Sequence, residues 1–421
     1  MGGSRDTRPP RSPEWCAQGS ADAALNAERT SILVGMTFAT LALIMAVALV
    51  GPLLAAPSRW NVPVVIGELA AGIALGRTGT GTLNADDPTF TLLADVGFAL
   101  VMFVAGSHVP VRDARLRPAL GTGLMRALTV AALAVPVALL VAHWFGTGHT
   151  PLFAVLMASS SAALVLPIVD GLGLSGPTVL PTLAQVAIAD TACIIALPLV
   201  IDPARAGKAA LGALAVIGSS VVLYALLQLA ERSGRRKQLH RFSERRAFAL
   251  ELRISLLILF TLAAVATQTS VSIMLAGFTF GMAVAGMGEP RRLARQLFAL
   301  SDGFFAPLFF VWLGASLDIR QLGQQPAMIG LGVVLGLAAV GVHLVTKLLG
   351  APLPLAVLSA AQLGVPVGAA TLGTQQHLLS SAEAAALVLG ALVTIAAVAV
   401  AGALLGQSVQ RSEGVAESSS P

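Results

Sequence analysis

Long runs of residues without a charged side chain recur along the whole sequence. Asp, Glu, Lys and Arg are absent from residues 30–58, 127–169, 254–288, 321–346, 348–382 and 384–410. A bilayer core of about 30 Å needs about 20 apolar residues of helix, so each run is long enough for one or two crossings. Apolar and polar residues do not alternate with a period of two, which argues against a β-barrel. Because lipid cannot satisfy backbone hydrogen bonds, the pattern predicts an all-α polytopic membrane protein.

The apolar runs and the breaks between them predict thirteen transmembrane spans. These spans cover residues 31–56, 61–77, 89–109, 118–145, 151–170, 177–201, 208–230, 247–267, 271–287, 293–317, 326–350, 353–376 and 383–409. We expect the polar segments 1–30 and 410–421 to be tails, and the first lacks the basic start and short apolar core of a signal peptide. We also expect no soluble nucleotide-binding domain after residue 409.

The composition agrees with a membrane location and argues against several other classes. Hydrophobic residues make up 56% of the 421 residues and charged residues 11%, whereas a soluble domain carries roughly 25% charged residues. Cys16 and Cys193 cannot form a disulfide framework, and no metal-ligand spacing is present. The sequence has no phosphate-cradling glycine loop and no Gly-x-Ser-x-Gly elbow, so we expect neither ATP drive nor an enzyme. We attribute the net charge of +5 to cytoplasmic loops, and expect no nucleic-acid partner and no cofactor.

The distribution of charge over the loops predicts the orientation of the chain. One set of alternate loops holds Arg59, Arg112, Arg115, Arg117, the basic residues between Arg232 and Arg246, and Arg291, Arg292 and Arg295. The other set holds Arg205, Lys208 and Arg320 together with Asp86, Asp87 and Asp202. Since cytoplasmic loops carry the excess of Lys and Arg, we expect a multi-pass plasma-membrane protein with its N-terminus outside and its C-terminus in the cytoplasm.

Two triplets of spans, one on each side of the charged segment 231–246, share the same character. In each triplet the middle span is interrupted, by Ser and Pro over residues 158–174 and by Gly and Pro over residues 361–376. The first triplet starts on the cytoplasmic side and the second starts outside. This is the pattern of an inverted-topology repeat with two discontinuous helices, although Gly and Pro are also common in ordinary membrane helices.

Asp190 is the strongest candidate for chemistry because it lies near the middle of span 177–201. A carboxylate at membrane depth costs several kcal/mol unless it is paired, hydrated or protonated. Burial favours its neutral form and a nearby cation favours its charged form, so such a group can bind a proton and a monovalent metal cation in turn. The alternative is a structural Asp bonded to a neighbouring hydroxyl or backbone group.

Several other polar residues within apolar spans could contribute to an ion site. Lys347 is either a counter-charge for that site or a side chain that extends to the interface, and His343 fits a packed histidine better than a proton relay. Glu68 and Asp95 could line a water-filled funnel, or lie hydrated near span ends. The remaining candidates are Ser159, Ser160 and Ser161 at the first break, Thr191 beside Asp190, and Gln362 and Thr371 at the second break. Gly67, Gly72 and Gly76 indicate close helix packing.

The segments around these residues resemble a known family. Residues 62–76, 93–106, 159–174, 275–286 and above all FFAPLFFVWLGASLDI (304–319) resemble the monovalent cation:proton antiporter superfamily, in the branch of bacterial sodium/proton and potassium-efflux antiporters. The resemblance covers about 31–409. It implies thirteen helices, two crossing broken helices, alternating access and a homodimer. It also places Asp190 on the essential ion-binding aspartate and Lys347 on the basic residue opposite it.

The resemblance further implies a division of the chain into core and scaffold. The expected parts are a tail (1–30), scaffold or dimerisation helices (31–117), the first core repeat (118–201), a linker helix and basic loop (202–246), further scaffold helices (247–317), the second core repeat (318–409) and a cytoplasmic tail (410–421).

One position departs from the family pattern. An acidic residue, Asn or Gln commonly precedes the essential aspartate, but this chain has Ala189 there. A single carboxylate predicts at most one proton exchanged for each cation. The sequence therefore favours exchange of Na⁺ or K⁺ for protons. It leaves open a transporter of the same fold for a small organic ion or metabolite, and a non-transporting sensor or assembly subunit.

Overall fold

The computed structural model describes residues 36–56, 64–107, 118–232, 250–269, 271–287 and 291–418. The predicted tail 1–30, most of the basic segment 231–246 and the arginines at 59, 112, 115 and 117 lie outside these residues. The described residues form helices joined by short connections, and no strand occurs among them.

The helices in the first half of the chain follow the predicted spans. They are α2 (Phe38–Ala48), α3 (Val50–Ala55), α4 (Val64–Leu75), α5 (Pro88–Ser107), α6 (Leu120–Phe145), α7 (Thr150–Ala158), α8 (Ala162–Gly171), α9 (Leu180–Ile201) and α10 (Ala206–Arg232).

The second half continues in the same way. Its helices are α12 (Leu250–Gln268), α13 (Ile273–Gly286), α14 (Arg291–Leu300), α15 (Ala306–Ser316), α16 (Ile319–Gln324), α17 (Pro326–Leu344), α18 (Leu353–Leu358), α19 (Gly364–Gln375) and α20 (Ser381–Ser418). A π-helical turn, η3 (Ser301–Phe305), joins α14 to α15, and a 3₁₀ segment, η4 (Val345–Leu349), continues α17.

The apolar character of these helices suits a lipid environment. Within the described residues, nine helical stretches are long and apolar enough to cross a membrane. Large apolar side chains such as Leu128, Trp144 and Leu211 are 60–73% exposed on their outer faces. A helix that is apolar all round must be buried in protein or in lipid, so these faces are the lipid-facing ones. The all-α membrane fold is confirmed, while thirteen crossings remain a prediction.

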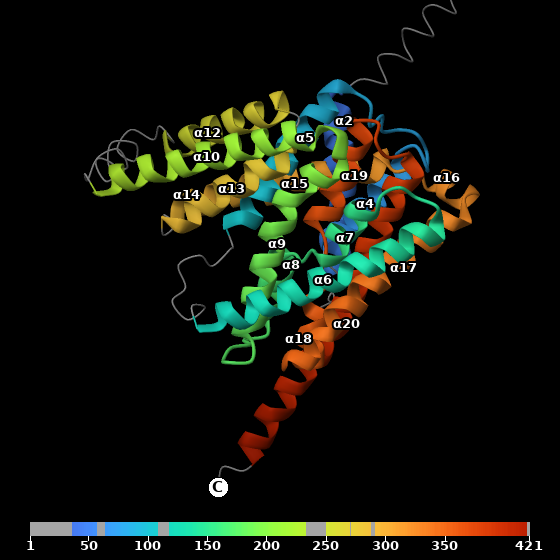
Figure 1. The fold of residues 1–421 in the computed structure, drawn as a ribbon. Helices are drawn as coiled ribbons and strands as arrows, with labels where there is room; N and C mark the ends of the chain where they lie inside the picture. Colours follow the sequence, from blue (N-terminus) through green and yellow to red (C-terminus); the bar gives the residue numbers. More distant parts are fainter. Residues whose placement is uncertain are drawn as a thin grey trace, which may run out of the picture.

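Helix packing divides the described chain into two groups. We call α2–α5 with α12–α15 the scaffold group and α6–α9 with α17–α20 the core group, since each helix packs chiefly within its own set. Helix α10 packs on α13 and α12 as well as on α9. In Figure 1, α10, α12 and α13 lie together on one side of the molecule, and α17 and α20 on the other.

Close backbone contact holds the scaffold group together, as the small residues predict. A methyl group added to Gly72 of α4 would come within 2.2 Å of the Val311 carbonyl oxygen of α15. The same holds for Gly277 of α13 and the Ala99 carbonyl oxygen of α5, at 2.2 Å. Only a residue without a side chain allows such an approach. Close packing at Gly67, Gly72 and Gly76 is confirmed.

The two interrupted spans are broken helices in the structure. The span 151–170 consists of α7 and α8, separated by the extended Ser159 and the two serines after it. The span 353–376 consists of α18 and α19, separated by residues 359–363. Each break leaves helix ends without internal hydrogen-bond partners. Both breaks belong to the core group, and they define where the candidate site lies.

Candidate functional site

The two breaks contact each other directly. The Ser160 hydroxyl donates to the Ser359 carbonyl at 2.6 Å. The Gln362 amide of the second break donates to the Leu156 carbonyl at 2.5 Å and lies 3.4 Å from the Ser159 carbonyl. The Leu156 carbonyl lies at the C-terminal end of α7, where it also accepts the Ser159 backbone N–H at 3.1 Å and the Ser159 hydroxyl at 2.7 Å. Side chains from each break therefore satisfy the backbone of the other and fix the crossing.

Asp190 lies on α9 against the first break. Its side chain is 3% exposed, and Oδ2 accepts a hydrogen bond from the Ala162 backbone N–H at 2.8 Å. Ala162 is the first residue of α8, so the carboxylate lies at the positive end of the α8 dipole. That contact is the backbone bond that a structural aspartate would make, and it is also the environment that stabilises a buried anion. It leaves Oδ1 without a hydrogen bond from the described residues.

The structure places Lys347 on η4, the 3₁₀ segment that continues α17. The Lys347 side chain is exposed and forms no ion pair with Asp190. In an α-helix, position 347 would share the face of His343, four residues earlier. The helix instead tightens into η4 after Leu344, and the larger turn per residue of a 3₁₀ segment rotates the following side chains. The exposed side chain fits the alternative in which Lys347 extends to the interface.

His343 is the basic residue that the structure places at the crossing. Its side chain is fully buried, with Nδ1 2.9 Å from the Ala339 carbonyl oxygen and Nε2 3.5 Å from the Ser160 hydroxyl. A carbonyl only accepts, so Nδ1 carries a proton. This geometry fits the packed histidine that the sequence favoured.

Gln185 is a polar residue of this region that the sequence reasoning missed. It is 1% exposed, and its Nε2 donates to the Ser359 hydroxyl at 3.2 Å, which in turn donates to the Ala356 carbonyl at 2.8 Å. Its Oε1 is buried without a hydrogen-bond partner. The sequence feature that could have identified it is a lone Gln in an apolar span, five residues before Asp190. An unsatisfied amide oxygen beside a break is a candidate cation ligand.

Arg126 is a second residue that the sequence reasoning missed. Its side chain is 3% exposed, and it donates to the Leu349 carbonyl at 3.1 Å and to the Thr182 hydroxyl at 3.4 Å. It thereby joins α6 to the end of η4 and to α9 within the core group. Its place inside the span predicted from residue 118 was a signal, because charges are rare there.

The other predicted residues do not gather around Asp190. Thr191 donates to its own helix, at the Ala187 carbonyl, 2.8 Å away. Glu68 is 4% exposed and packs beside Gly51 of α3. Asp95 of α5 accepts a hydrogen bond from the Gln375 amide of α19 at 3.3 Å, and Thr371 lies on that same helix. Asp95 and Thr371 thus lie together, apart from the Ala162–Asp190 contact.

Known proteins show the same overall architecture. The fold is similar to that of the sodium proton antiporter MjNhaP1 from Methanocaldococcus jannaschii, with a TM-score of 0.60 and 16% identity over 87% of this chain and 97% of that one. The chain is 27% identical over 265 residues to the Na⁺/H⁺ antiporter NhaS5 of Synechocystis sp., covering 62% of this chain and 37% of that protein. It is 24% identical over 385 residues to the putative Na⁺/H⁺ antiporter YjbQ of Bacillus subtilis, covering 84% and 61%.

The fold and the two broken helices that meet define a polytopic α-helical membrane protein. The family model described as sodium/hydrogen exchanger, transmembrane, matches residues 44–410, and the chain belongs to that family. It spans less than two thirds of the length of NhaS5 and of YjbQ.

Proposed function

We propose that this protein exchanges a monovalent cation, Na⁺ or K⁺, for protons, with Asp190 as the group that binds each in turn. The observation that carries the proposal is the buried Asp190 carboxylate at the N-terminus of α8, inside the crossing of two broken helices. An ionised carboxylate at this depth needs a positive partner or a proton. The Lys347 ammonium is not that partner, so a transported cation and a proton compete for Asp190. The antiporter names of the relatives support the same activity.

The surrounding groups have separable roles in this mechanism. The Ala162 N–H and the α8 dipole favour the ionised carboxylate and so keep the site open to a cation. The unsatisfied Gln185 Oε1 supplies a second oxygen for a hard cation. Hydrogen bonds between the breaks, from Ser160 and Gln362, hold the backbone around the site.

Alternating access would move the core group against the scaffold group. A methyl group added to Gly364 of α19 would lie 3.4 Å from Met102, and one added to Gly368 would lie 2.7 Å from the Met274 sulfur. Glycines have no side chain to interlock, and methionine side chains are flexible, so α19 can move along the scaffold helices at this contact. The same proposal includes a homodimer, an external N-terminus and a cytoplasmic C-terminus, as the loop charges and the family resemblance predict.

The deciding experiment uses purified protein in liposomes. An imposed pH gradient should dissipate when Na⁺, K⁺ or Li⁺ is added, and Asp190→Asn should abolish the response. Asp202→Asn is the matched control, because Asp202 also accepts a backbone N–H, from Ala204 at 3.1 Å, but does so in the turn that follows the C-terminal end of α9. Unchanged cation-dependent flux in Asp190→Asn would refute the role of Asp190.

Ala189 favours a second candidate, a carrier of the same fold for a small organic ion or metabolite. The family motif usually supplies an acidic residue, Asn or Gln at this position, so with Ala189 the site has one polar side chain fewer. The liposome assay separates the two candidates. No response to any alkali cation, with Asp190-dependent flux of an organic cation such as tetramethylammonium or choline, would favour the second.

A further inference from the structure

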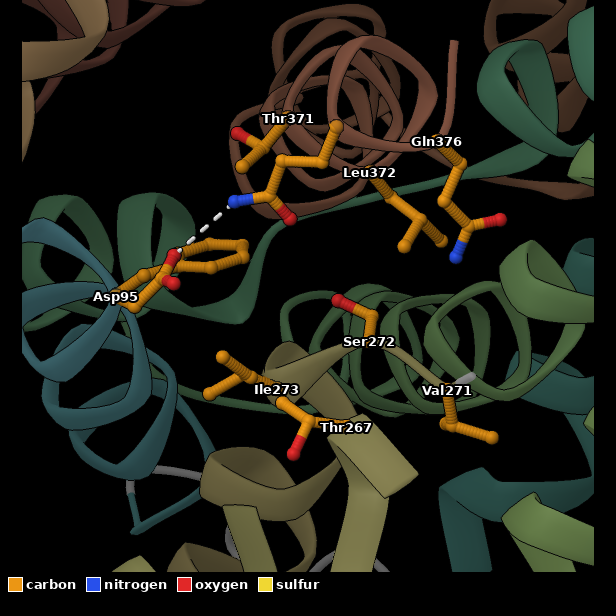
Figure 2. A pocket seen from close by; sticks show the side chains of 10 residues that line it. Asp95, Thr267, Val271, Ser272, Ile273, Thr371, Leu372 and Gln376 are labelled. Atoms are coloured by element: carbon orange, nitrogen blue, oxygen red, sulfur yellow. Dashed lines mark hydrogen bonds between the residues drawn. The ribbon is translucent and has the colours of Figure 1, made fainter. Parts of the chain in front are cut away.

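A cavity of about 200 Å³ lies where the scaffold group meets α19. Its lining comes from α5, from α12 and the start of α13, and from α19, as Figure 2 shows. Asp190 is not among the lining residues. A second cavity of about 420 Å³ lies on another side of α19, and both cavities share Thr371 and Gln375. One turn of α19 is therefore flanked by open space on two sides.

The smaller cavity carries oxygen atoms suited to a cation. Asp95 is the acidic residue in its lining, and the Gln375 amide donates to Asp95 Oδ1 at 3.3 Å, the dashed line in Figure 2. The Thr371 side chain is 7% exposed, and its hydroxyl is buried without a hydrogen-bond partner. Thr267, Ser272 and Gln376 supply the rest of the polar lining.

The volume and the charge of the cavity indicate which kind of ligand can bind in it. A water molecule occupies about 30 Å³ of liquid, so the cavity can hold an ion together with several waters. A carboxylate, hydroxyls and an amide oxygen are the ligands that hard cations take. Among the lining residues that the structure describes, there is no Lys, Arg or His to offset the Asp95 charge. The lining also has an apolar part, from Phe98, Val271, Ile273 and Leu372, but the Asp95 carboxylate disfavours an anion there.

We propose that this cavity is a second binding site, which holds a hydrated monovalent cation between Asp95 and Thr371. The inference rests on the proposed exchange function and adds a second ion-binding site, separate from Asp190, on the path of the ion. An acidic group beside the path concentrates cations at the entrance to the crossing. Because the Asp95–Gln375 bond joins scaffold to core, movement of α19 would break it and release the ion.

Equilibrium binding of ²²Na⁺ to purified protein tests the site apart from transport. In the Asp190→Asn background, Na⁺ binding should persist. Adding Asp95→Asn should weaken it by about tenfold or more, and adding Thr371→Val by a smaller factor. Thr374→Val is the matched control on α19, because its hydroxyl already donates to the Ala370 carbonyl at 2.7 Å and it does not line this cavity.

The outcomes separate this proposal from the proposed function. If Asp190→Asn protein binds no Na⁺ while the native protein exchanges it, the second site is refuted and the exchange function stands. If Asp95→Asn and Thr374→Val bind Na⁺ alike, the cavity is not a cation site. If binding depends on Asp95 but no cation supports exchange, the site stands and the exchange function fails. Should Asp190→Asn not fold, the same substitutions in the native background, read as the apparent KM for Na⁺, give the same test.

Discussion

The Gln185 side chain has one satisfied group and one unsatisfied group at the crossing. Its Nε2 is fixed by the Ser359 hydroxyl, whereas Oε1 has no partner. A buried amide oxygen left unsatisfied costs about 1–3 kcal/mol. A cation bound by Oε1 would offset that cost, which is the reason we assign this oxygen to the ion.

Gln185→Leu should therefore affect ion binding more than folding. We expect the apparent KM for the transported cation to rise about tenfold, a change of roughly 1.4 kcal/mol. The thermal midpoint should change little, because the substitution removes the unsatisfied oxygen together with the bond to Ser359. Cation-dependent exchange and a melting curve in detergent measure both effects. An unchanged KM would show that Oε1 does not contact the ion.

Competition at Asp190 gives a defined pH dependence. Raising the pH removes protons that compete with the cation, so the apparent KM for the cation should fall. With one titrating carboxylate the fall is limited to about tenfold per pH unit. Exchange rates over a matrix of cation concentration and pH provide the slope, and a limiting fall near a hundredfold per unit would contradict the single-carboxylate site.

Arg126 acts on stability rather than on the ion. Its bonds to Leu349 and Thr182 link three elements of the core group. Hydrogen bonds from a charged group contribute about 1.5–3 kcal/mol, so Arg126→Met should lower the thermal midpoint while the apparent KM stays near the native value. Arg253→Met is the control, because Arg253 is exposed on α12 and should melt like the native protein. Equal midpoints for the two variants would contradict this role.

At the scale of elements, close packing of α5 on α13 keeps the scaffold group rigid. A methyl group at Gly277 would meet the Ala99 carbonyl oxygen at 2.2 Å, and one at Gly106 would meet the Phe278 carbonyl oxygen at 2.2 Å. The contact is therefore backbone on backbone from both sides, and neither helix can yield by turning a side chain.

Gly277→Ala should destabilise the protein by about 1–3 kcal/mol, the usual cost of overpacking. Gly341→Ala on α17 is the matched control, because a methyl group there meets no atom within 4 Å. That control should be neutral or slightly stabilising, since Ala is favoured over Gly in a helix. Midpoints of thermal unfolding in detergent compare the two, and similar values would show that α5 and α13 can separate at little cost.

At the scale of the whole molecule, the number of carboxylates at the site sets the net charge that each transport cycle moves across the membrane. With Ala189 in place of a second acidic or polar group, one proton exchanged for one cation moves no net charge. Membrane voltage alone, imposed by a K⁺ gradient and valinomycin with Na⁺ as the substrate, should not drive exchange. A strong response to voltage would overturn the one-for-one cycle, and Ala189→Asp is the variant in which we expect such a response to emerge.

The sequence by itself determined the class of fold. The charge-free runs, Asp190 near the middle of the apolar span 177–201, and two spans interrupted by Ser, Gly and Pro can all be read from the chain, and together they predict a helical membrane protein. Each interrupted span became a pair of half-helices, because a break in the sequence is a local property of the backbone. The glycines at 67, 72 and 76 likewise predicted close packing before any partner helix was known.

Only the tertiary structure decided which side chains meet at the crossing. Lys347 is exposed on the 3₁₀ segment after Leu344, whereas His343, four residues earlier, is buried, and residue spacing alone does not predict that segment. Gln185, Arg126 and the pairing of Asp95 with Gln375 depend on contacts between residues tens to hundreds of positions apart. The physical reason is that lipid fixes where a span lies in depth, whereas the rotation of each helix is fixed only by the helices packed against it.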